Sequence, residues 1–474
     1  MESKDTSQEV IEQAEQEVNE GKKRHISSKI INGDTLIELC YDQNKNETYF
    51  YIKEAGSEIT KIEKYGDYLP ISPDNPIVNS RVILFPSQPE DYIDEDRLLL
   101  DIKEFIHQYV DLPEEFESIC TYYVMMSNLY EKLPVVPYLR VIGDWGSGKT
   151  RFLHTIGAIS RNPIFASGAT TTAPIFRLID GFGGTFVLDE ADFSSDMKAD
   201  LTKILNQGNM PGFPILRSHL KEQHIVIPYN VFGPKIVASR GYFDDEALET
   251  PFITEKLENK RVRKDIPTTL TEEFWSQALK IRNKLLKFRL DKFLSYRNIP
   301  IEEHGDIDPE IIKDLDPRLK QITEPLLSII RSPELKKMVL LHSKKHIEEV
   351  KANKGLTFEA GILETMLTLV FCSEDKKAYM QEIASKFNSD NSNSLRSSLS
   401  ARKVGHILRT KFLINTGRDN KGIYVNDIEE KLKKLAERYN IDIESIVEAY
   451  KAHKEKIEKE REKDEKDVEK TNLF

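Results

Sequence analysis

One glycine-rich segment, Gly143-Asp144-Trp145-Gly146-Ser147-Gly148-Lys149-Thr150, constrains this chain more than any other. It follows a short apolar, β-branched run at 138–142 and precedes a segment, 151–159, whose apolar residues recur at helical spacing. The pattern G-x-x-x-x-G-K-[ST] between a strand and a helix is typical of a phosphate-binding loop. Glycines allow positive φ and turn successive N–H groups toward phosphate oxygens, and the following helix adds its positive N-terminal end. The sequence therefore predicts an α/β unit built around this loop.

The residues of the loop have separate roles in such a site. Lys149 would reach the β- and γ-phosphates of a nucleotide, and the Thr150 hydroxyl would hold Mg²⁺. The alternative is a glycine turn that binds nothing. The predicted cofactors are ATP and Mg²⁺, with loop contacts from Gly143, Gly146, Ser147, Gly148, Lys149 and Thr150.

A second motif supports the first. Thr185-Phe186-Val187-Leu188 runs into Asp189-Glu190-Ala191-Asp192, as expected for a buried parallel strand that ends at a nucleotide site. Asp189 would hold Mg²⁺, directly or through water, and Glu190 would orient and polarise the attacking water. In the alternative interpretation, the two acids simply begin a loop.

A further apolar run, Lys235-Ile236-Val237-Ala238-Ser239-Arg240, predicts another core strand with polar residues at its end. Ser239 is a candidate to contact the γ-phosphate or the attacking water, with Arg240 as its neighbour. The spacing is equally compatible with a structural role for both.

Two strand-like runs, 213–217 and 224–228, flank a polar segment and predict a β-hairpin before that last strand. Its basic residues Arg217, His219 and Lys221 would bind DNA phosphates without reading sequence. The alternative is a solvated turn, in which Lys and His are common.

Together these elements resemble the AAA+ ATPases, in particular the subgroup with a hairpin before the sensor strand, such as minichromosome-maintenance and superfamily 3 helicases. The region 138–254 is most similar to ATPases of plasmids, phages and other mobile elements that are labelled primase or helicase. The sequence segments that carry this resemblance are Ile142-Gly143-Asp144-Trp145-Gly146-Ser147-Gly148-Lys149-Thr150-Arg151, Pro163-Ile164-Phe165-Ala166-Ser167-Gly168-Ala169, Leu188-Asp189-Glu190-Ala191-Asp192, Ile204-Leu205-Asn206-Gln207-Gly208 and Phe243-Asp244-Asp245-Glu246-Ala247-Leu248-Glu249.

The resemblance implies an α/β fold with an AAA+ type core, a helical lid that follows it, and a hexameric ring on DNA. Arg318, near the start of a helix in the lid, is a candidate to contact the nucleotide; the alternative is a surface arginine. One departure concerns Pro251, which stands where such proteins carry a finger arginine that stabilises the transferring phosphoryl group. Either Arg240, Arg261 or Arg263 replaces it, or hydrolysis is slow.

The C-terminal part predicts a winged helix-turn-helix. A helix at 379–387, a candidate recognition helix at 400–409 and a wing at 416–425 follow in order. Residues 376–425 hold ten basic and three acidic residues, which is 10 − 3, or +7, in a chain of net charge -11. This asymmetry favours DNA binding through Arg402, Lys403 and Arg409, whereas the alternative is a winged helix that binds protein.

The predicted organisation along the chain has six parts. They are a disordered leader (1–25), a β-rich N-terminal module (26–92), the AAA+ core with a helical lead-in (93–265), a helical lid or linker (266–372), the winged helix (373–440) and a charged helical tail (441–474).

Composition narrows the protein class. Three cysteines lie far apart without metal-ligand spacing, the N-terminus is no signal peptide, and no apolar run is long enough to span a membrane, so a cytoplasmic protein is expected. The favoured function is an ATP-dependent DNA helicase or translocase in replication of a mobile element, acting on single-stranded or forked DNA as a homo-oligomer. The alternative is a DNA-binding ATPase switch for replication initiation or regulation without unwinding. A primase is disfavoured, because the first 130 residues hold no persuasive pair of metal-binding carboxylates.

Overall fold

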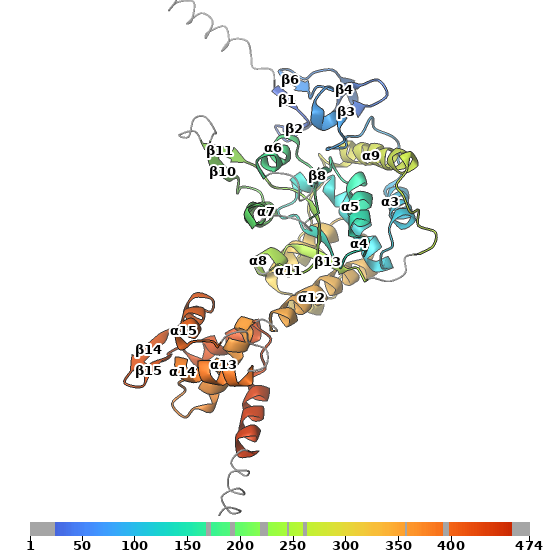
Figure 1. Ribbon diagram of the computed structural model, residues 1–474. Helices are drawn as coiled ribbons and strands as arrows, with labels where there is room; N and C mark the ends of the chain where they lie inside the picture. The colour runs from blue at the N-terminus through green and yellow to red at the C-terminus, as the bar shows by residue number, and fades with distance from the viewer. Residues whose placement is uncertain are drawn as a thin grey trace, which may run out of the picture. The chain divides into compact units, whose positions relative to one another are not determined.

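The computed structural model describes residues 24–166, 172–189, 195–218, 226–243, 246–258, 263–355, 358–391 and 398–456 (Figure 1). The chain forms two compact units, of which the first ends at His346 and the second begins at Ile347. Most of the predicted leader and the end of the tail lie outside the described residues, but Arg24 and His25 belong to a strand, β1 (Arg24–Ile26). Among the described residues, no helix combines the length and hydropathy that a membrane crossing requires.

The first unit is a mixed α/β structure around a five-stranded sheet in the order β13-β7-β12-β9-β8. All four strand pairs are parallel. The strands are short and mostly apolar, and nearly all their residues are buried, as in a sheet covered on both faces. Three of them match the strands predicted at 138–142, 185–188 and 235–240, whereas β13 was not predicted. Their bounds are β7 (Tyr138–Ile142), β8 (Ile164–Ala166), β9 (Phe186–Asp189), β12 (Lys235–Ser239) and β13 (Phe252–Lys256).

Helices connect these strands because parallel neighbours need crossover connections. The predicted helix after the phosphate loop is present, and its residues pack against three strands of the sheet. The predicted hairpin is also present as an antiparallel pair of strands outside the main sheet. The bounds are α5 (Lys149–Ile159), α6 (Thr172–Phe182), α7 (Ser195–Gln207), β10 (Ile215–Ser218), β11 (Val226–Tyr229) and α8 (Glu246–Glu249).

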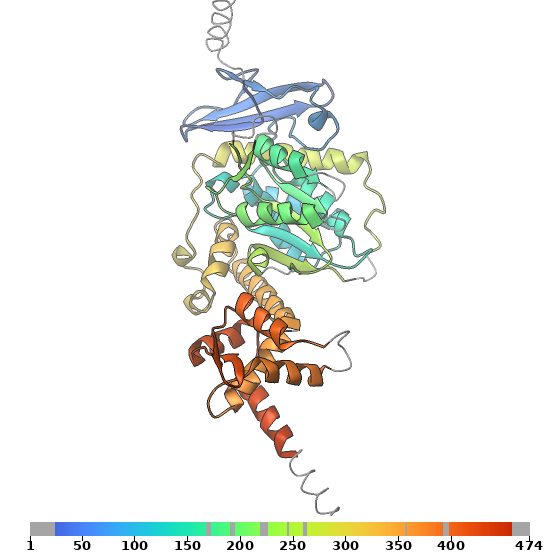
Figure 2. The same cartoon turned by 60° about the vertical axis from the view of Figure 1, so that its left-hand side comes forward.

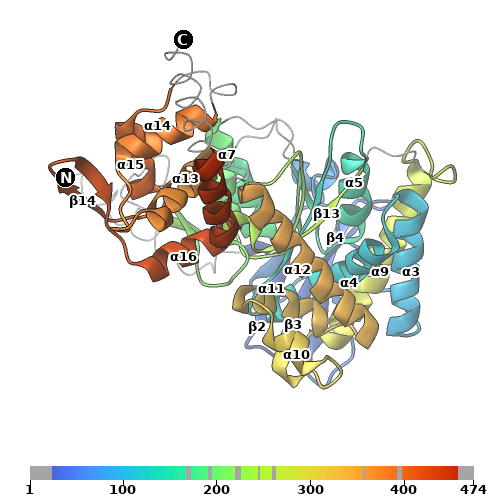
Figure 3. The ribbon, with the colours of Figure 1, turned by 90° about the horizontal axis from the view of Figure 1, so that it is seen from below.

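Within the predicted helical lead-in, the structure has two helices, α3 (Glu95–Tyr109) and α4 (Glu114–Ser127), and Pro113 directly precedes the second. Asp94 begins α3 by accepting a hydrogen bond from the Arg97 backbone N–H at 2.8 Å. Figure 3 shows α3, α4 and the later helix α9 (Glu272–Lys292) side by side. A short turn, η1 (Tyr130–Lys132), then leads to β7.

Within the predicted β-rich module, the structure has an antiparallel sheet in the order β2-β3-β4-β5. It has no separate core, because Ile37, Leu39 and Phe50 belong to the same buried cluster as Phe176 and Phe186 of the nucleotide-loop unit. Figure 2 shows this sheet lying across α9. The bounds are β2 (Ser28–Ile31), β3 (Thr35–Asp42), β4 (Glu47–Glu54), β5 (Thr60–Ile62), β6 (Tyr68–Pro70) and α2 (Pro76–Asn79), and β6 pairs with β1.

A buried ionic network joins the module to the rest of the unit. Glu38 of β3 accepts from Arg289 Nε of α9 at 2.8 Å and pairs with Arg161 at 2.8 Å. Arg289 also donates twice to Glu131. Burial alone would raise the pKa of Glu38, but the two arginines outweigh it and hold that pKa below its ordinary value.

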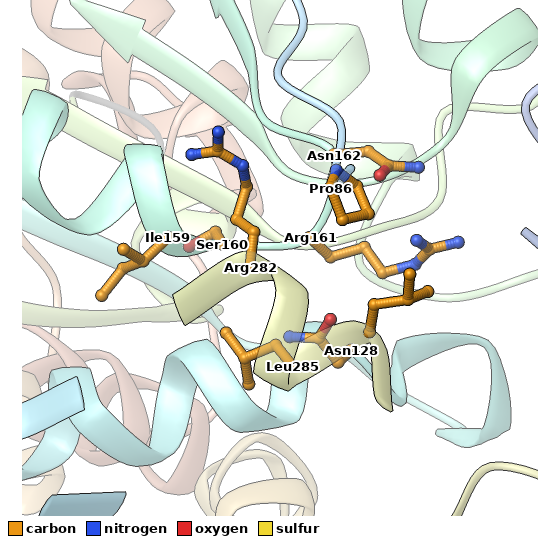
Figure 4. A pocket seen from close by; sticks show the side chains of 9 residues that line it. Pro86, Asn128, Ile159, Ser160, Arg161, Asn162, Arg282 and Leu285 are labelled. Atoms are coloured by element: carbon orange, nitrogen blue, oxygen red, sulfur yellow. The ribbon is translucent and has the colours of Figure 1, made fainter. Parts of the chain in front are cut away.

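Helix α9 carries basic residues that are buried. Arg289 is fully buried, and Arg282 is buried with Nη1 donating to the Ala158 carbonyl of α5 at 2.5 Å. Burial lowers the pKa of Arg282 to about 9. In Figure 4 the guanidinium groups of Arg161 and Arg282 point in different directions beside a small cavity. These arginines therefore tie separate elements together instead of facing water.

The predicted lid segment, 266–372, is divided between the units. Its first helix, α9, contacts α3, α5 and β4 and so braces the core. Further helices of the first unit follow, and α13 belongs to the second unit. The bounds are η2 (Ile301–Glu303), α10 (Pro309–Lys313), α11 (Pro317–Leu327), α12 (Pro333–Gly355) and α13 (Phe358–Cys372).

The second unit contains the helices and hairpin predicted between 379 and 425, around a buried cluster of its own. Ser400 begins the candidate recognition helix by accepting from the Lys403 backbone N–H at 3.3 Å. Gly422, at φ +135°, sits where the hairpin turns. The bounds are α14 (Met380–Asp390), α15 (Ala401–Thr410), β14 (Thr416–Asp419), β15 (Gly422–Val425) and α16 (Glu429–Arg438).

Candidate nucleotide site

The site lies where three adjacent strands end. Ser239 of β12 is opposite Ile142 of β7, and Ala238 is opposite Asp189 of β9, so the three carboxyl ends reach the same level. After β7 the chain crosses to β8 at one edge of the sheet, and after β12 it crosses to β13 at the opposite edge. Ligands of open α/β sheets bind at such a switch point, outside the carboxyl ends of the strands.

The loop after β7 has the backbone of a phosphate cradle. Gly146 and Gly148 have φ of +79° and +90°, which glycine adopts without strain. Gly143 is required for a different reason, because a Cβ there would lie 2.9 Å from the Leu257 carbonyl oxygen. Helix α5 begins at Lys149, so its positive end faces the loop. The loop can therefore present backbone N–H groups and a helix terminus to an anion.

Lys149 is folded onto its own loop. Its Nζ donates to the carbonyl oxygens of Gly143 at 2.5 Å and Asp144 at 2.7 Å. Burial lowers the pKa of Lys149, while the nearby Asp189 carboxylate opposes this shift and Arg240 adds to it. Two weak acceptors hold the ammonium here, and it can exchange them for phosphate oxygens.

Thr150 and Asp189 supply the oxygen ligands that Mg²⁺ prefers. The Thr150 hydroxyl lies 3.4 Å from Asp189 Oδ2. Among the described residues, no group of three or more His, Cys, Asp or Glu could hold a metal by itself. A cation here would therefore need further oxygens, such as those of a nucleotide, as Mg²⁺ at phosphate sites commonly does.

The loop also contains an orphaned polar atom. Within the described chain, Ser147 Oγ is buried and has no hydrogen-bond partner. A buried hydroxyl without a partner is costly unless a ligand or water satisfies it. Together with the hydroxyl and carboxylate pair of Thr150 and Asp189, this atom makes the residues fit ATP with Mg²⁺.

Ser239 and Arg240 lie beside the loop but differ in what they can do. Ser239 is buried, its hydroxyl donates to the Gly241 carbonyl at 2.9 Å, and its own carbonyl accepts from the Gly143 N–H at 3.3 Å. Arg240 is exposed, and its positive charge contributes to the lowered pKa of Lys149. Arg240 is therefore the better placed of the two to meet a phosphate, while Ser239 anchors the loop.

Sequence reasoning missed two neighbours of the loop. His154 lies one helical turn after Thr150, and its ring stacks on Phe165 at 5.6 Å between centroids. Burial lowers the pKa of His154. Trp145, at the tip of the loop, is 88% exposed. The helical spacing from Thr150 could have identified His154, whereas the exposure of a tryptophan cannot be read from sequence.

Several predicted residues fall outside the described part of the chain. Glu190 follows the last described residue of β9, and His219 and Lys221 come between β10 and β11 in the sequence. Arg261 lies in another such gap. Their predicted roles stay predictions.

Arg217 and Arg263 both contact other side chains of the first unit. Arg217 pairs with Asp200 of α7 at 2.6 Å and lies 4.0 Å from the Phe176 ring centroid, so it braces the base of the hairpin. The Arg263 backbone and side chain contact Asp111 and His107 beside α3. Both guanidinium groups therefore have partners within the chain, and their predicted roles stay predictions.

The hydrogen bonds of Arg318 lie at the start of α11. Its backbone N–H donates to Asp316 Oδ1 at 2.8 Å at the start of α11, and Nη1 donates to Gln321 at 3.2 Å. Burial raises the pKa of Tyr138, the first residue of β7, and the charge of Arg318 opposes that rise. The phosphate loop follows the opposite end of this strand.

In the second unit, α15 exposes a basic face. Arg402, Lys403, His406 and Arg409 are exposed, while Val404, Ile407 and Leu408 pack inward. This division follows the helical period. The hairpin adds the exposed Arg418 and Lys421. The predicted cations of this unit therefore lie on a solvent-facing surface.

No family model matches the chain, and the curated proteins contain no match to its sequence. Among solved structures, the chain is similar to the A form apo structure of the NrS-1 C-terminal region, at 11% identity and a TM-score of 0.31 over 82% of this chain and 95% of that one. It is also similar to a full-length MCM homolog from Methanopyrus kandleri, at 12% identity and a TM-score of 0.32 over 66% and 74%. Drosophila ORC bound to DNA matches at 11% identity and a TM-score of 0.17 over 74% and 96%. Similarity at this level carries no inference about function.

Proposed function

We propose that this chain is an ATP-dependent AAA+ type ATPase that acts on DNA during replication. The observation that carries the proposal is the meeting of Thr150 and Asp189 at 3.4 Å beside a glycine cradle. That meeting joins the two motifs recognised in the sequence at one edge of a parallel sheet.

The residues would divide the work at this site. The N–H groups of the loop and the start of α5 would bind the phosphates, and Lys149 would leave the carbonyls of Gly143 and Asp144 for phosphate oxygens. Thr150 and Asp189 would hold Mg²⁺, which neutralises phosphate charge when bound. Glu190 would orient and polarise water, and Arg240 would stabilise negative charge that develops on the transferred group.

The favoured activity is that of a DNA helicase or translocase of a mobile element. The hairpin tip, with His219 and Lys221, would follow single-stranded or forked DNA inside a homo-oligomeric, hexameric ring. The basic face of α15, read as the recognition helix of a winged helix, would bind DNA through Arg402, Lys403 and Arg409.

A DNA-binding ATPase switch without unwinding is the second candidate, and two observations favour it. Pro251 occupies the position where a finger arginine is expected, and its carbonyl accepts from the Tyr138 N–H at 2.8 Å within the sheet. Arg217 is committed to Asp200, which leaves the hairpin fewer cations for DNA.

A strand-displacement assay on forked DNA with ATP and Mg²⁺ tests the proposal. Unwinding by the wild-type chain, lost in Lys149→Ala and Glu190→Gln, supports the helicase. ATP hydrolysis and DNA binding without unwinding would instead support the switch. Absence of ATP binding would contradict both.

A further inference from the structure

A cluster of side chains is centred on Arg140 of β7, and we call it the Arg140 cluster. Arg140 stands in the middle of β7 and is completely buried. Its two Nη atoms donate to the Glu249 carboxylate of α8, and its Nε donates to Thr254 Oγ1 of β13 at 3.1 Å. The cluster comprises Arg140, Tyr242, Phe243, Glu249, Phe252 and His346.

The cluster holds the loop that carries Arg240. Glu249 accepts a hydrogen bond from the Phe243 backbone N–H. The Arg140 guanidinium lies 5.6 Å from the ring centroid of Tyr242 and 5.3 Å from that of Phe243. Tyr242 is two residues after Arg240 in the chain, so this packing lies close to Arg240 along the backbone.

The same cluster contacts α12. The ring of His346 stacks on Tyr242 at 5.7 Å between centroids, and its Nε2 lies 3.7 Å from Glu249 Oε2. One turn earlier, His342 Nε2 lies 2.8 Å from the Thr254 carbonyl. Helix α12 ends at Gly355, beyond the start of the second unit at Ile347.

We propose that the Arg140 cluster couples the nucleotide site to α12, with Tyr242 and His346 as the positioning residues that join them. A phosphate that draws Arg240 toward the loop also shifts Tyr242, and Tyr242 shifts its contact with His346. The inference rests on the proposed nucleotide site. Any such coupling works in both directions, so a partner that moves α12 also changes nucleotide affinity.

Amide hydrogen exchange of the full chain tests this coupling, with and without saturating ATPγS and Mg²⁺. Isothermal calorimetry measures nucleotide binding separately. In the wild-type chain, nucleotide is expected to change exchange rates across 333–355 by at least about fivefold. Tyr242→Phe keeps the stacked ring and should behave as wild type, as should Lys345→Ala, an exposed neighbour on the same helix.

Tyr242→Ala and His346→Ala should bind ATPγS within about threefold of the wild-type affinity but change exchange across 333–355 by less than about twofold. If an alanine variant fails to fold by circular dichroism, Tyr242→Leu or His346→Gln replaces it, since each retains bulk without the stacked ring. An exchange response that persists in both variants would overturn the coupling, as would its absence in a nucleotide-bound wild type. If the wild type binds no nucleotide, the proposed function itself fails, and with it this inference.

Discussion

The Thr150 hydroxyl lies 3.4 Å from Asp189 Oδ2 although 39 positions separate the two residues in the chain. The two residues come close because of the sheet order. Strand β7 leads into the loop with Thr150, β9 ends at Asp189, and only β12 lies between these strands. A hydroxyl and a carboxylate at this spacing, beside a helix N-terminus, can share one hard cation with a phosphate.

Removal of the Asp189 charge should therefore weaken Mg²⁺-dependent binding. Asp189→Asn is expected to lower the affinity for ATPγS about 10–100-fold with Mg²⁺ present, which is the usual scale for damage to a metal site. With EDTA in place of Mg²⁺, the variant and the wild type should bind alike. Isothermal calorimetry under both conditions measures the difference, and equal losses under both would show that Asp189 acts without a metal.

Trp145 should report nucleotide binding by fluorescence. The chain has two tryptophans, and Trp145 is 88% exposed at the tip of the loop. In a Trp275→Phe background, ATPγS with Mg²⁺ is expected to change the remaining emission in a saturable way, because the bound phosphates alter its surroundings. Adding Lys149→Ala should shift the titration to higher concentrations. A flat signal together with calorimetric binding would mean that the loop tip does not sense the ligand.

The buried carboxylate of Glu38 should stabilise the first unit in a pH-dependent way. Glu38→Gln leaves Arg289 and Arg161 without a full counter-charge and is expected to cost about 3–5 kcal/mol in the free energy of unfolding at pH 7. Glu54→Gln, an exposed change on the neighbouring strand, is the matched control.

The sign of this pH dependence follows from the lowered pKa of Glu38. The folded state favours the ionised form of Glu38 more than the unfolded state does. The ionised carboxylate therefore stabilises the fold at pH values above the unfolded pKa of about 4.3. It is lost as pH falls through the lower folded pKa. In urea unfolding, the difference in the free energy of unfolding between wild type and Glu38→Gln should shrink below about pH 4. A difference that does not depend on pH would contradict the pairing.

Lys235 should give the same trend, a stability that rises with pH, in a higher pH range. Its Nζ donates to the carbonyls of Gly208, Val231 and Gly233, and burial lowers its pKa to about 7. Between pH 7 and about 10.4 the unfolded chain binds the proton more strongly, so this group adds stability as pH rises, by at most about 1.4 kcal/mol per pH unit. Urea unfolding of Lys235→Met between pH 7 and 9 should lack this slope. A slope equal to that of the wild type would assign it to other groups.

The exposed face of α15 should bind DNA electrostatically. Arg402→Ala with Arg409→Ala is expected to reduce the slope of log affinity against log salt by about 2 for duplex DNA, because each phosphate contact contributes about 0.9. Lys434→Ala, an exposed change on α16 in the same unit, is the control. Fluorescence anisotropy over a salt series measures the slope. An unchanged slope would favour a protein partner for this surface.

Sequence reasoning located most elements of the core because their signals are local. The strand before Gly143, the helix after Lys149 and the run that ends at Asp189 each show their own period and boundary residues. It missed β13, whose five residues follow directly on Pro251 without a distinct turn signal.

The part of the site that local sequence motifs encode was also predictable. Lys149, Thr150 and Asp189 come together as expected, since parallel strands end at one edge of a sheet. The predicted roles of Arg217 and Arg318 stay predictions, but the structure gives both side chains partners that the sequence did not indicate. A cation in a sequence carries no mark of its partner, and Asp200 is brought to Arg217 by folding.

The sequence by itself determined the phosphate loop, because positive φ at Gly146 and Gly148 and the strand and helix around them depend only on neighbouring residues. The tertiary structure alone decided which charges are buried and paired. Glu38 meets Arg289, and Arg140 meets Glu249, across long stretches of chain. Desolvation and ion pairing act on distances in space, and those distances exist only once the sheet order and the position of α9 are set.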